Sequence, residues 1–292
     1  MRQKTFNEYL KEKFGCKVYK ISLNAGTTCP TRDSTKGTRG CIFCSAKGSG
    51  DFAPAANIPI KEQLSLGKKA VSAKGAKKYI AYFGTFTSTY APVQRLKNIF
   101  TQAIDDDEIV ALDIATRPDC LPDDILSLLG ELAEKKPLFV ELGLQTIHEK
   151  TADYIRRGYP LEEYDSAVKK LHAINANVVT HLILGLPGES EEMILDSVKY
   201  VANAGSDGIK LQLLHILKGT DLYEEYLLGK VKTMELSEYT ELLCKCLKVL
   251  PDDIVIHRLT GDGDKRILAA PMWSADKKRV LNTLKKATDK IE

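Results

Sequence analysis

Short apolar runs alternate with longer stretches of helical periodicity along most of the chain. The apolar runs are rich in β-branched, Leu and aromatic residues, and they predict six strands, at residues 17–23, 78–84, 108–116, 137–145, 177–185 and 208–217. The amphipathic stretches between them predict helices at 61–74, 92–104, 122–135, 148–156, 161–175 and 189–204. Because strands that alternate with helices pair in parallel through right-handed crossovers, the pattern indicates an α/β fold.

Six such units in a row, without a Gly-x-Gly-x-x-Gly sequence after the first strand, favour a partial (β/α)6 barrel of the TIM type over an open doubly wound sheet. We expect this core over residues 1–218. Residues 219–292 predict a C-terminal α/β extension packed on the same domain, with helices and one short strand at 220–228, 236–249, 253–259 and 275–290. Barrels of this kind carry their chemistry on the loops after the strands.

The composition is that of an ordinary globular protein, with 292 residues, 43% hydrophobic and 28% charged side chains. No apolar run approaches the length of about eighteen residues that indicates a transmembrane helix. The N-terminus is amphipathic and charged, without the apolar core of a signal peptide. We therefore expect a cytoplasmic protein with no membrane partner and reduced thiols, and the seven cysteines fit a disulfide framework poorly.

The net charge of +3 does not by itself indicate a nucleic-acid partner. Lysines are concentrated in residues 61–78 and 277–290, where solvated helix faces are the simpler interpretation and a phosphate-rich partner is the alternative. Lys77 and Lys78 at the end of the first segment, together with Lys265 and Arg266, are expected in or beside the loops that surround the barrel mouth.

Three cysteines lie close together in the loop after the first predicted strand, at Cys29, Cys41 and Cys44. The last two form a Cys-x2-Cys pair, which lets two thiolates reach one centre from a single turn. Zinc would need a fourth ligand, usually Cys or His, and no His precedes His148. Three thiolates without a fourth partner instead favour a 4Fe–4S cluster with one open iron, while zinc or unmodified thiols are the alternatives.

A three-cysteine loop after the first strand of a six-unit barrel resembles the radical S-adenosylmethionine (SAM) superfamily. The eleven-residue first gap departs from the common Cys-x3-Cys-x2-Cys spacing and is similar to that of the YhcC/YtqA-type family, which is related to the elongator catalytic subunit. Residues 15–275 carry the resemblance, through the segments "NAGTTCPTRDSTKGTRGCIFC", "YFGTFTSTYAP", "ATRPDCL", "VELGLQTIHEKTADYIRRGY", "THLILGLPGES", "LHILKGTDL" and "HRLTGDGD".

The resemblance implies an iron–sulfur enzyme in which Cys29, Cys41 and Cys44 are the catalytic metal ligands. They would hold three irons of the cluster, and the fourth iron would bind the amino and carboxylate groups of SAM. One electron, supplied by a donor such as flavodoxin or ferredoxin, would cleave SAM to methionine and a 5′-deoxyadenosyl radical that takes a hydrogen atom from the substrate.

The resemblance also implies a set of SAM-binding residues along the barrel mouth: Phe43, Gly84, Thr85, Gln145, Arg157, His181, Gly185 and His215. Arg157 would pair with the SAM carboxylate, a role that the neighbouring Arg156 could also take. The Glu usual after the second strand is absent, so its contact would come from the backbone, from Thr85 or from Thr87. Strand alternation places Glu141 on the same face as Gln145, which is either the barrel interior or a surface-exposed end of this strand. Ordinary turns, loop packing and core hydrogen bonds are the alternative roles for these residues.

The elongator-like resemblance implies tRNA as the partner and a wobble uridine as the target. For the YtqA-type branch it suggests conversion of 5-carboxymethylaminomethyl-uridine toward the 5-aminomethyl form. Three alternatives stay open: a radical SAM enzyme with a small-molecule substrate, a zinc-stabilised RNA-binding module, and an electron carrier whose cluster has a structural role.

Overall fold

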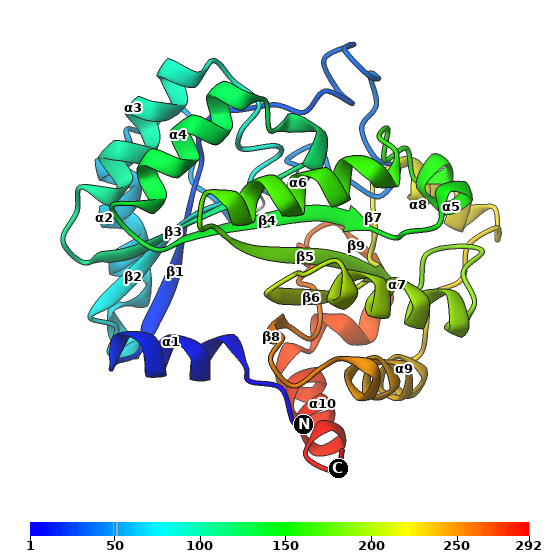
Figure 1. Cartoon of the computed structure of the whole chain (residues 1–292). Coiled ribbons are helices and arrows are strands. Elements are labelled where there is room, and N and C mark those ends of the chain that lie inside the picture. The colour runs from blue at the N-terminus through cyan, green and yellow to red at the C-terminus, as the bar shows by residue number, and fades with distance from the viewer. Residues whose placement is uncertain (49, 51, 292) are drawn as a thin grey trace.

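The computed structural model describes residues 1–48, 50 and 52–291. Its centre is a curved sheet of seven parallel strands (Figure 1). In spatial order the strands are β1 (Val18–Leu23), β2 (Lys78–Phe83), β3 (Ile109–Thr116), β4 (Leu138–Gln145), β5 (Asn177–Leu184), β6 (Gly208–Leu213) and β8 (Val255–Arg258). Because the spatial order follows the chain order, the predicted α/β partial barrel is confirmed.

Helices connect the strands and pack on the outer face of the sheet (Figure 1). These are α2 (Ile60–Val71), α3 (Val93–Ile104), α4 (Asp123–Ala133), α5 (Glu149–Tyr154), α6 (Leu161–Ala173) and α7 (Glu191–Asn203). The C-terminal part adds α8 (Asp221–Leu227), α9 (Leu236–Val249) and α10 (Lys277–Thr288). Short 3-10 turns occur at η1 (Ser72–Lys74), η2 (Pro118–Cys120) and η3 (Met272–Ala275). Each predicted helix is present, and its ends are shifted by at most a few residues.

Two predictions about strands need correction. The predicted strand 208–217 is interrupted after β6, and its last two residues form β7 (Ile216–Leu217), which pairs antiparallel with β9 (Leu268–Ala270). In addition, β8 joins the main sheet beside β6, so the barrel has seven strands where six were expected. The C-terminal extension therefore contributes a wall of the barrel itself, because four residues of β8 complete an edge that β6 would otherwise expose.

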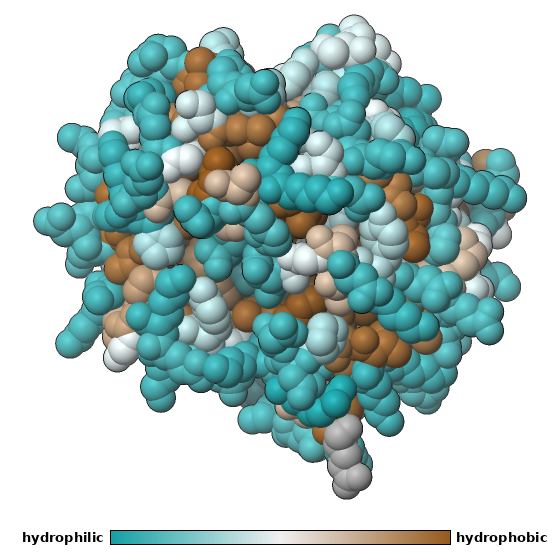
Figure 2. Space-filling view, viewed as in Figure 1, coloured by the Kyte–Doolittle hydropathy of each residue, from teal (hydrophilic) through white to brown (hydrophobic). Residues whose placement is uncertain are grey.

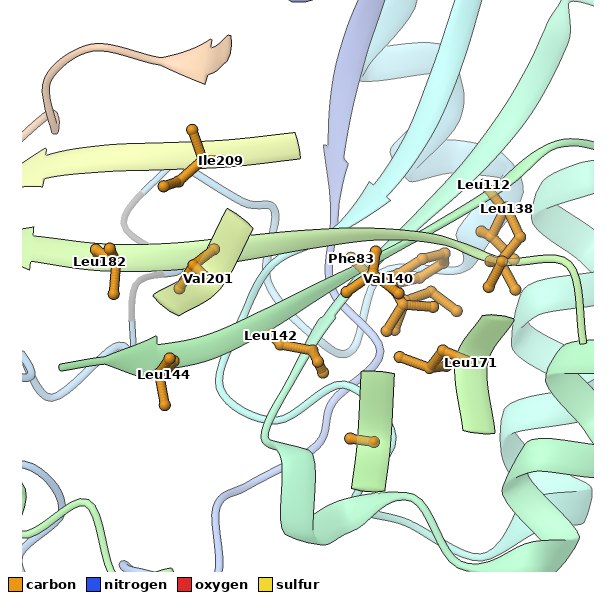
Figure 3. Packing of buried hydrophobic residues seen from close by; sticks show 14 of the residues in the cluster. Phe83, Leu112, Leu138, Val140, Leu142, Leu144, Leu171, Leu182, Val201 and Ile209 are labelled. Carbon is orange, nitrogen blue, oxygen red and sulfur yellow. The ribbon is translucent and has the colours of Figure 1, made fainter. Parts of the chain in front are cut away.

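Residues of alternating chemistry along β4 separate the hydrophobic core from the barrel interior. Val140, Leu142 and Leu144 are buried in the cluster between the sheet and the helices, where Leu171 of α6 also packs (Figure 3). The intervening Glu141, Gly143 and Gln145 line a cavity on the other face of the sheet. Since side chains alternate between the two faces of a strand, the apolar outer face fixes which polar side chains point inward.

Helix α1 (Phe6–Phe14) closes the amino end of the barrel. It starts with a capping box between Thr5 and Glu8, and its buried Phe6 and Leu10 pack in one cluster with strand residues that include Val18 and Phe139. The site must therefore open at the carboxyl end. Lys78 is the first residue of β2 and lies at the amino end, so the prediction that Lys77 and Lys78 surround the barrel mouth is wrong.

The two ends of the described chain lie side by side (Figure 1). The Met1 amino group donates a hydrogen bond to the Thr288 carbonyl over 2.6 Å, which ties the N-terminus to α10. Hydrophilic residues cover most of the face in Figure 2 and break up its hydrophobic areas. Among the helices of the described residues, none has the length and apolarity that crossing a membrane requires.

Candidate active site

A cavity of about 320 Å³ occupies the barrel interior and is lined by residues from the cysteine loop and from all seven strands or the loops after them. Cys29, Cys41 and Cys44 all belong to this lining. The prediction that the three cysteines share one site at the carboxyl ends of the strands therefore agrees with the geometry. Arg117, which follows β3, also reaches the cavity.

The cysteine loop is held by short-range contacts. The Cys29 Sγ atom lies 3.1 Å from the Thr31 hydroxyl, and the Cys41 thiol donates to the Arg156 carbonyl over 3.7 Å. A backbone hydrogen bond of 3.0 Å from Cys44 to Cys41 closes the Cys-x2-Cys turn. Arg32 supports the same turn, since its Nη2 atom donates to the carbonyls of Cys44 and Ser45 at 3.0 and 2.7 Å.

The chemistry of this loop fits the ligands of an iron–sulfur cluster. Burial raises the pKa of the Cys41 thiol to about 12, and the neighbouring Cys44 adds to this, so a bound metal would be needed to hold the thiolate. Within residues 1–48, 50 and 52–291, no three His, Cys, Asp or Glu side chains are already arranged to hold a metal ion. This arrangement is compatible with a cluster, because each thiolate of a cluster binds a different iron. The cluster ligands therefore surround a space and do not converge on a single metal ion.

Among the residues that the structure describes, three buried polar atoms around the cavity have no hydrogen-bond partner. They are the Thr85 hydroxyl, the Gln145 Oε1 atom and the His215 Nε2 atom, and all three residues line the cavity. An unpaired buried polar group costs about 1–3 kcal/mol, so these atoms indicate where polar groups of a ligand would bind. Gln145 also has a φ of 71°, an unfavourable conformation for a residue other than glycine, and such strain concentrates at functional sites.

Three other predicted cofactor residues, Phe43, Gly84 and His181, also lie in the cavity wall. Gly84 cannot be replaced without rearrangement, because an added Cβ would stand 2.3 Å from the Tyr82 ring. Gly185 is not part of the lining. Its φ of 89° serves the turn after β5, and its Cα faces the Met234 side chain, so the geometry does not support the predicted contact of Gly185 with SAM.

Arg157 reaches the cavity but is largely occupied by protein partners. Its guanidinium donates to the carbonyls of Tyr159 and Thr146 at 3.0 and 2.6 Å and to Glu149 at 2.8 Å. Its contact with the SAM carboxylate stays a prediction, and these bonds favour a positioning role. The alternative residue, Arg156, forms an ion pair with Asp221.

Below the cysteine loop, the barrel interior contains a network of buried charges. The carboxylate of Glu141 accepts bonds from Lys20 and His181 at 2.8 Å each and forms a close ion pair with Lys210. Lys20 also contacts Asp113. Burial alone would raise the pKa of Glu141, but Lys20 and Lys210 outweigh it and hold that pKa well below its usual value. Burial and the nearby Glu141 carboxylate raise the pKa of Asp113 to about 7.

The sequence profile of the Radical SAM superfamily matches residues 33–201, which is more than half of the chain. The chain belongs to the radical SAM superfamily. The Radical_SAM C-terminal domain matches residues 206–290, the part that supplies β8 and α10. Membership in this superfamily implies a 4Fe–4S cluster and SAM, and it favours the cluster over zinc at the three cysteines.

Two relatives identify the branch of the radical SAM superfamily. The protein is 43% identical to YtqA of Bacillus subtilis over 98% of this chain and 89% of YtqA, and 38% identical to YhcC of Escherichia coli over 92% of this chain and 86% of YhcC. It therefore belongs to the YhcC/YtqA-type family, as the sequence motifs indicated.

Two more distant matches involve proteins with a longer chain. A tRNA uridine(34) acetyltransferase of Methanocaldococcus jannaschii is 28% identical over 52% of this chain and 28% of its own length. The solved structure of the archaeal Elp3 of Methanocaldococcus infernus matches with a TM-score of 0.70 and 18% identity over 94% of this chain and 64% of that chain. This structural likeness supports the fold.

Sequence reasoning missed most of the charged interior of this radical SAM barrel. Of the two positions open to Glu141, the structure has the inward one, and His181 is a predicted SAM contact, whereas Lys20, Lys210 and Arg258 are not among the predicted site residues. A usable signal was present, because Lys20 and Lys210 are the only charged residues within β1 and β6. An ionisable residue in the middle of an apolar parallel strand indicates a polar interior, since burial is otherwise costly.

Proposed function

We propose that this radical SAM protein converts 5-carboxymethylaminomethyl-uridine in tRNA to 5-aminomethyl-uridine. The observation that carries the proposal is the similarity of half the chain to a tRNA uridine(34) acetyltransferase, within a protein whose own family is radical SAM. That relative is much longer than the segment it shares with this protein, so the shared part supports an RNA uridine as the target and gives no support for acetyl transfer.

The cysteine loop and the cavity wall would hold the two cofactors. Cys29, Cys41 and Cys44 would bind three irons, and the unpaired atoms of Thr85, Gln145 and His215 would bond to polar groups of SAM. When bound and reduced, the cluster and SAM supply a carbon radical that is able to take a hydrogen atom from an unactivated C–H bond. The barrel keeps this chemistry inside a largely closed interior, with α1 excluding water from the amino end.

The proposed reaction is balanced without a further oxidant. The hydrogen atom would be taken from the methylene between the amine and the carboxylate. The substrate would then return a second electron to the centre that reduced SAM and lose a proton, which leaves a carbon–nitrogen double bond that water hydrolyses. The two electrons removed from the substrate are those that SAM gains when it becomes methionine and 5′-deoxyadenosine. The products are 5-aminomethyl-uridine, glyoxylate, methionine and 5′-deoxyadenosine, and one proton is released.

Exposed cations near the cavity support a nucleic-acid partner. Lys47, Arg39, Lys265 and Arg266 each lie within three residues of the cavity lining. The side chains of Arg39 and Arg266 are 68% and 71% exposed, and they also form ion pairs with Asp221 and Asp264. Such cations would contact the phosphates on both sides of an extruded base, because a nucleoside must leave its stack to enter the barrel.

The proposal is tested by comparing tRNA nucleosides from cells with and without the gene, using mass spectrometry. Loss of the gene should increase 5-carboxymethylaminomethyl-uridine and deplete 5-aminomethyl-uridine and anything made from it. The wild-type gene and a Cys246→Ala variant should restore the profile, because Cys246 is buried in the core away from the cavity, whereas Cys41→Ala should not. An unchanged nucleoside profile in the deletion strain would favour a small-molecule substrate instead.

A further inference from the structure

One cation of the barrel interior has no anionic partner. Arg258, at the end of β8, is half-buried and lines the cavity. Its Cα atom is paired in the sheet with Lys210 of β6, which also lines the cavity, so the two side chains stand next to each other on the inner face. Within the part of the chain that the structure describes, the Arg258 guanidinium has neither an ion pair nor a hydrogen bond, and its pairing in the sheet involves the backbone alone.

The charges around Arg258 do not balance it. The barrel interior contains three cations, Lys20, Lys210 and Arg258, and two carboxylates, Glu141 and Asp113. Glu141 is shared by both lysines, and Asp113 contacts Lys20, so neither carboxylate compensates the guanidinium.

The other titratable groups near Arg258 do not compensate it either. Asp262 lines the same cavity, but its carboxylate is paired with Lys277 over 2.7 Å. Burial lowers the pKa of His181 and of His215 to about 4, so both imidazoles are neutral near pH 7. The site therefore has an excess of positive charge in a partly desolvated wall, which is a favourable environment for a bound anion.

We propose that Arg258, with Lys210 beside it, binds a carboxylate of the substrate. This inference rests on the proposed function, in which the carboxylate belongs to the carboxymethylaminomethyl group of the uridine. A planar guanidinium suits a carboxylate because it can donate two parallel hydrogen bonds.

The depth of Arg258 separates this site from the cofactor end of the cavity. Arg258 is level with Lys210, which lies three residues before the carboxyl end of β6 at Leu213. At about 3.3 Å per residue, this layer is roughly 10 Å below the strand ends. The cysteines stand on the loop beyond the strand ends, where the amino-acid part of SAM must reach the cluster. A carboxylate held by Arg258 would thus lie on the far side of the reacting methylene.

The same site would distinguish substrate from product. The substrate has a carboxylate that Arg258 and Lys210 attract, whereas the aminomethyl product has an ammonium group that both cations repel. Product would therefore leave the barrel more readily than substrate, without any movement of the protein. A binding measurement can detect this difference in the absence of turnover.

The experiment measures binding of anticodon stem-loops to the full-length protein, reconstituted with its cluster under anaerobic conditions without a reductant and with SAM present. Three stem-loops carry 5-carboxymethylaminomethyl-uridine, 5-aminomethyl-uridine or uridine. The wild type should bind the carboxylate-bearing loop at least tenfold more tightly than the aminomethyl loop, as expected for a charged hydrogen bond. Arg258→Gln should reduce this preference to about twofold or less, and Arg258→Lys should keep part of it because the charge remains.

Two controls separate the site from general effects. Arg279→Gln removes an exposed arginine of α10 outside the cavity lining and should keep the wild-type preference. SAM affinity of Arg258→Gln, measured by calorimetry, should be unchanged. If Arg258→Gln retains the tenfold preference, or if it weakens the binding of SAM and of both modified stem-loops equally, the proposed carboxylate site is wrong while the proposed function stands. If the wild type binds all three loops equally, both the site and the proposed uridine substrate are wrong.

Discussion

Replacing Glu141 with Gln should destabilise the protein more than any other single change in the barrel interior. The Glu141 side chain is 0% exposed and accepts contacts from Lys20, Lys210 and His181. Glutamine keeps the shape but removes the negative charge, and it leaves two buried ammonium groups close together. Removing one partner of a buried ion pair costs about 3–5 kcal/mol, a large part of the 5–15 kcal/mol of a typical domain.

The matched control is Asp113→Asn, which removes the other buried carboxylate of the network. Among the described residues, Asp113 forms an ion pair with Lys20 alone, and burial beside Glu141 raises its pKa to about 7, so much of its population is already neutral at pH 7. We expect this change to cost about 1 kcal/mol or less, within the range of a single hydrogen bond.

Chemical unfolding of the cluster-free, reduced protein at pH 7, followed by circular dichroism, measures both free energies. A loss of about 3–5 kcal/mol for Glu141→Gln corresponds to a melting temperature lowered by roughly 6–20 °C. If Glu141→Gln unfolds within about 1 kcal/mol of the wild type, or no more easily than Asp113→Asn, then Glu141 is not the charge that holds the interior together.

Three further outcomes follow from named side chains. Cys41→Ala should prevent stable iron incorporation, whereas Cys246→Ala should leave the iron content unchanged, as measured by metal analysis after anaerobic reconstitution. A full iron content in Cys41→Ala would contradict the ligand assignment. Burial, with help from Lys210, lowers the pKa of His181 to about 4. Between about pH 6.5 and 4 the unfolded chain therefore binds a proton at this residue that the folded protein does not bind. The free energy of unfolding should decrease as the pH falls through this range, and His181→Gln should make this decrease smaller. Arg258→Gln should raise the substrate-free melting temperature, since it removes an unpaired cation beside Lys210, and a lower melting temperature would indicate a structural partner for the guanidinium.

Much of the fold could be predicted because the apolar pattern is strong in each strand. In β4, the alternation of Val140, Leu142 and Leu144 with Glu141 identifies both the strand and its inner face. The seventh strand could not be placed in the sheet, since β8 is four residues long and its pairing with β6 depends on tertiary contacts. For the same reason the position of Arg258 beside Lys210 could not be predicted.

The candidate site was predictable where the signal was local. The three cysteines share a spacing that indicates their chemistry without a structure, and the structure brings them to one cavity. Arg157 shows the opposite case, because its position in a motif could not reveal that carbonyls of Thr146 and Tyr159 already bind its guanidinium. Gly185 is a SAM contact implied by the resemblance, but the positive φ that requires glycine there belongs to a turn outside the cavity.

Hydrogen transfer from the tRNA nucleoside to 5′-deoxyadenosine tests the central claim most directly. The reconstituted protein would be given SAM, a reductant and tRNA whose 5-carboxymethylaminomethyl-uridine carries deuterium on the methylene next to the carboxylate. Mass spectrometry should find deuterium in 5′-deoxyadenosine, in an amount that matches the 5-aminomethyl-uridine formed, and none with Cys41→Ala. Formation of unlabelled 5′-deoxyadenosine at the same rate with and without this tRNA, with the nucleoside unchanged, would contradict the proposed reaction.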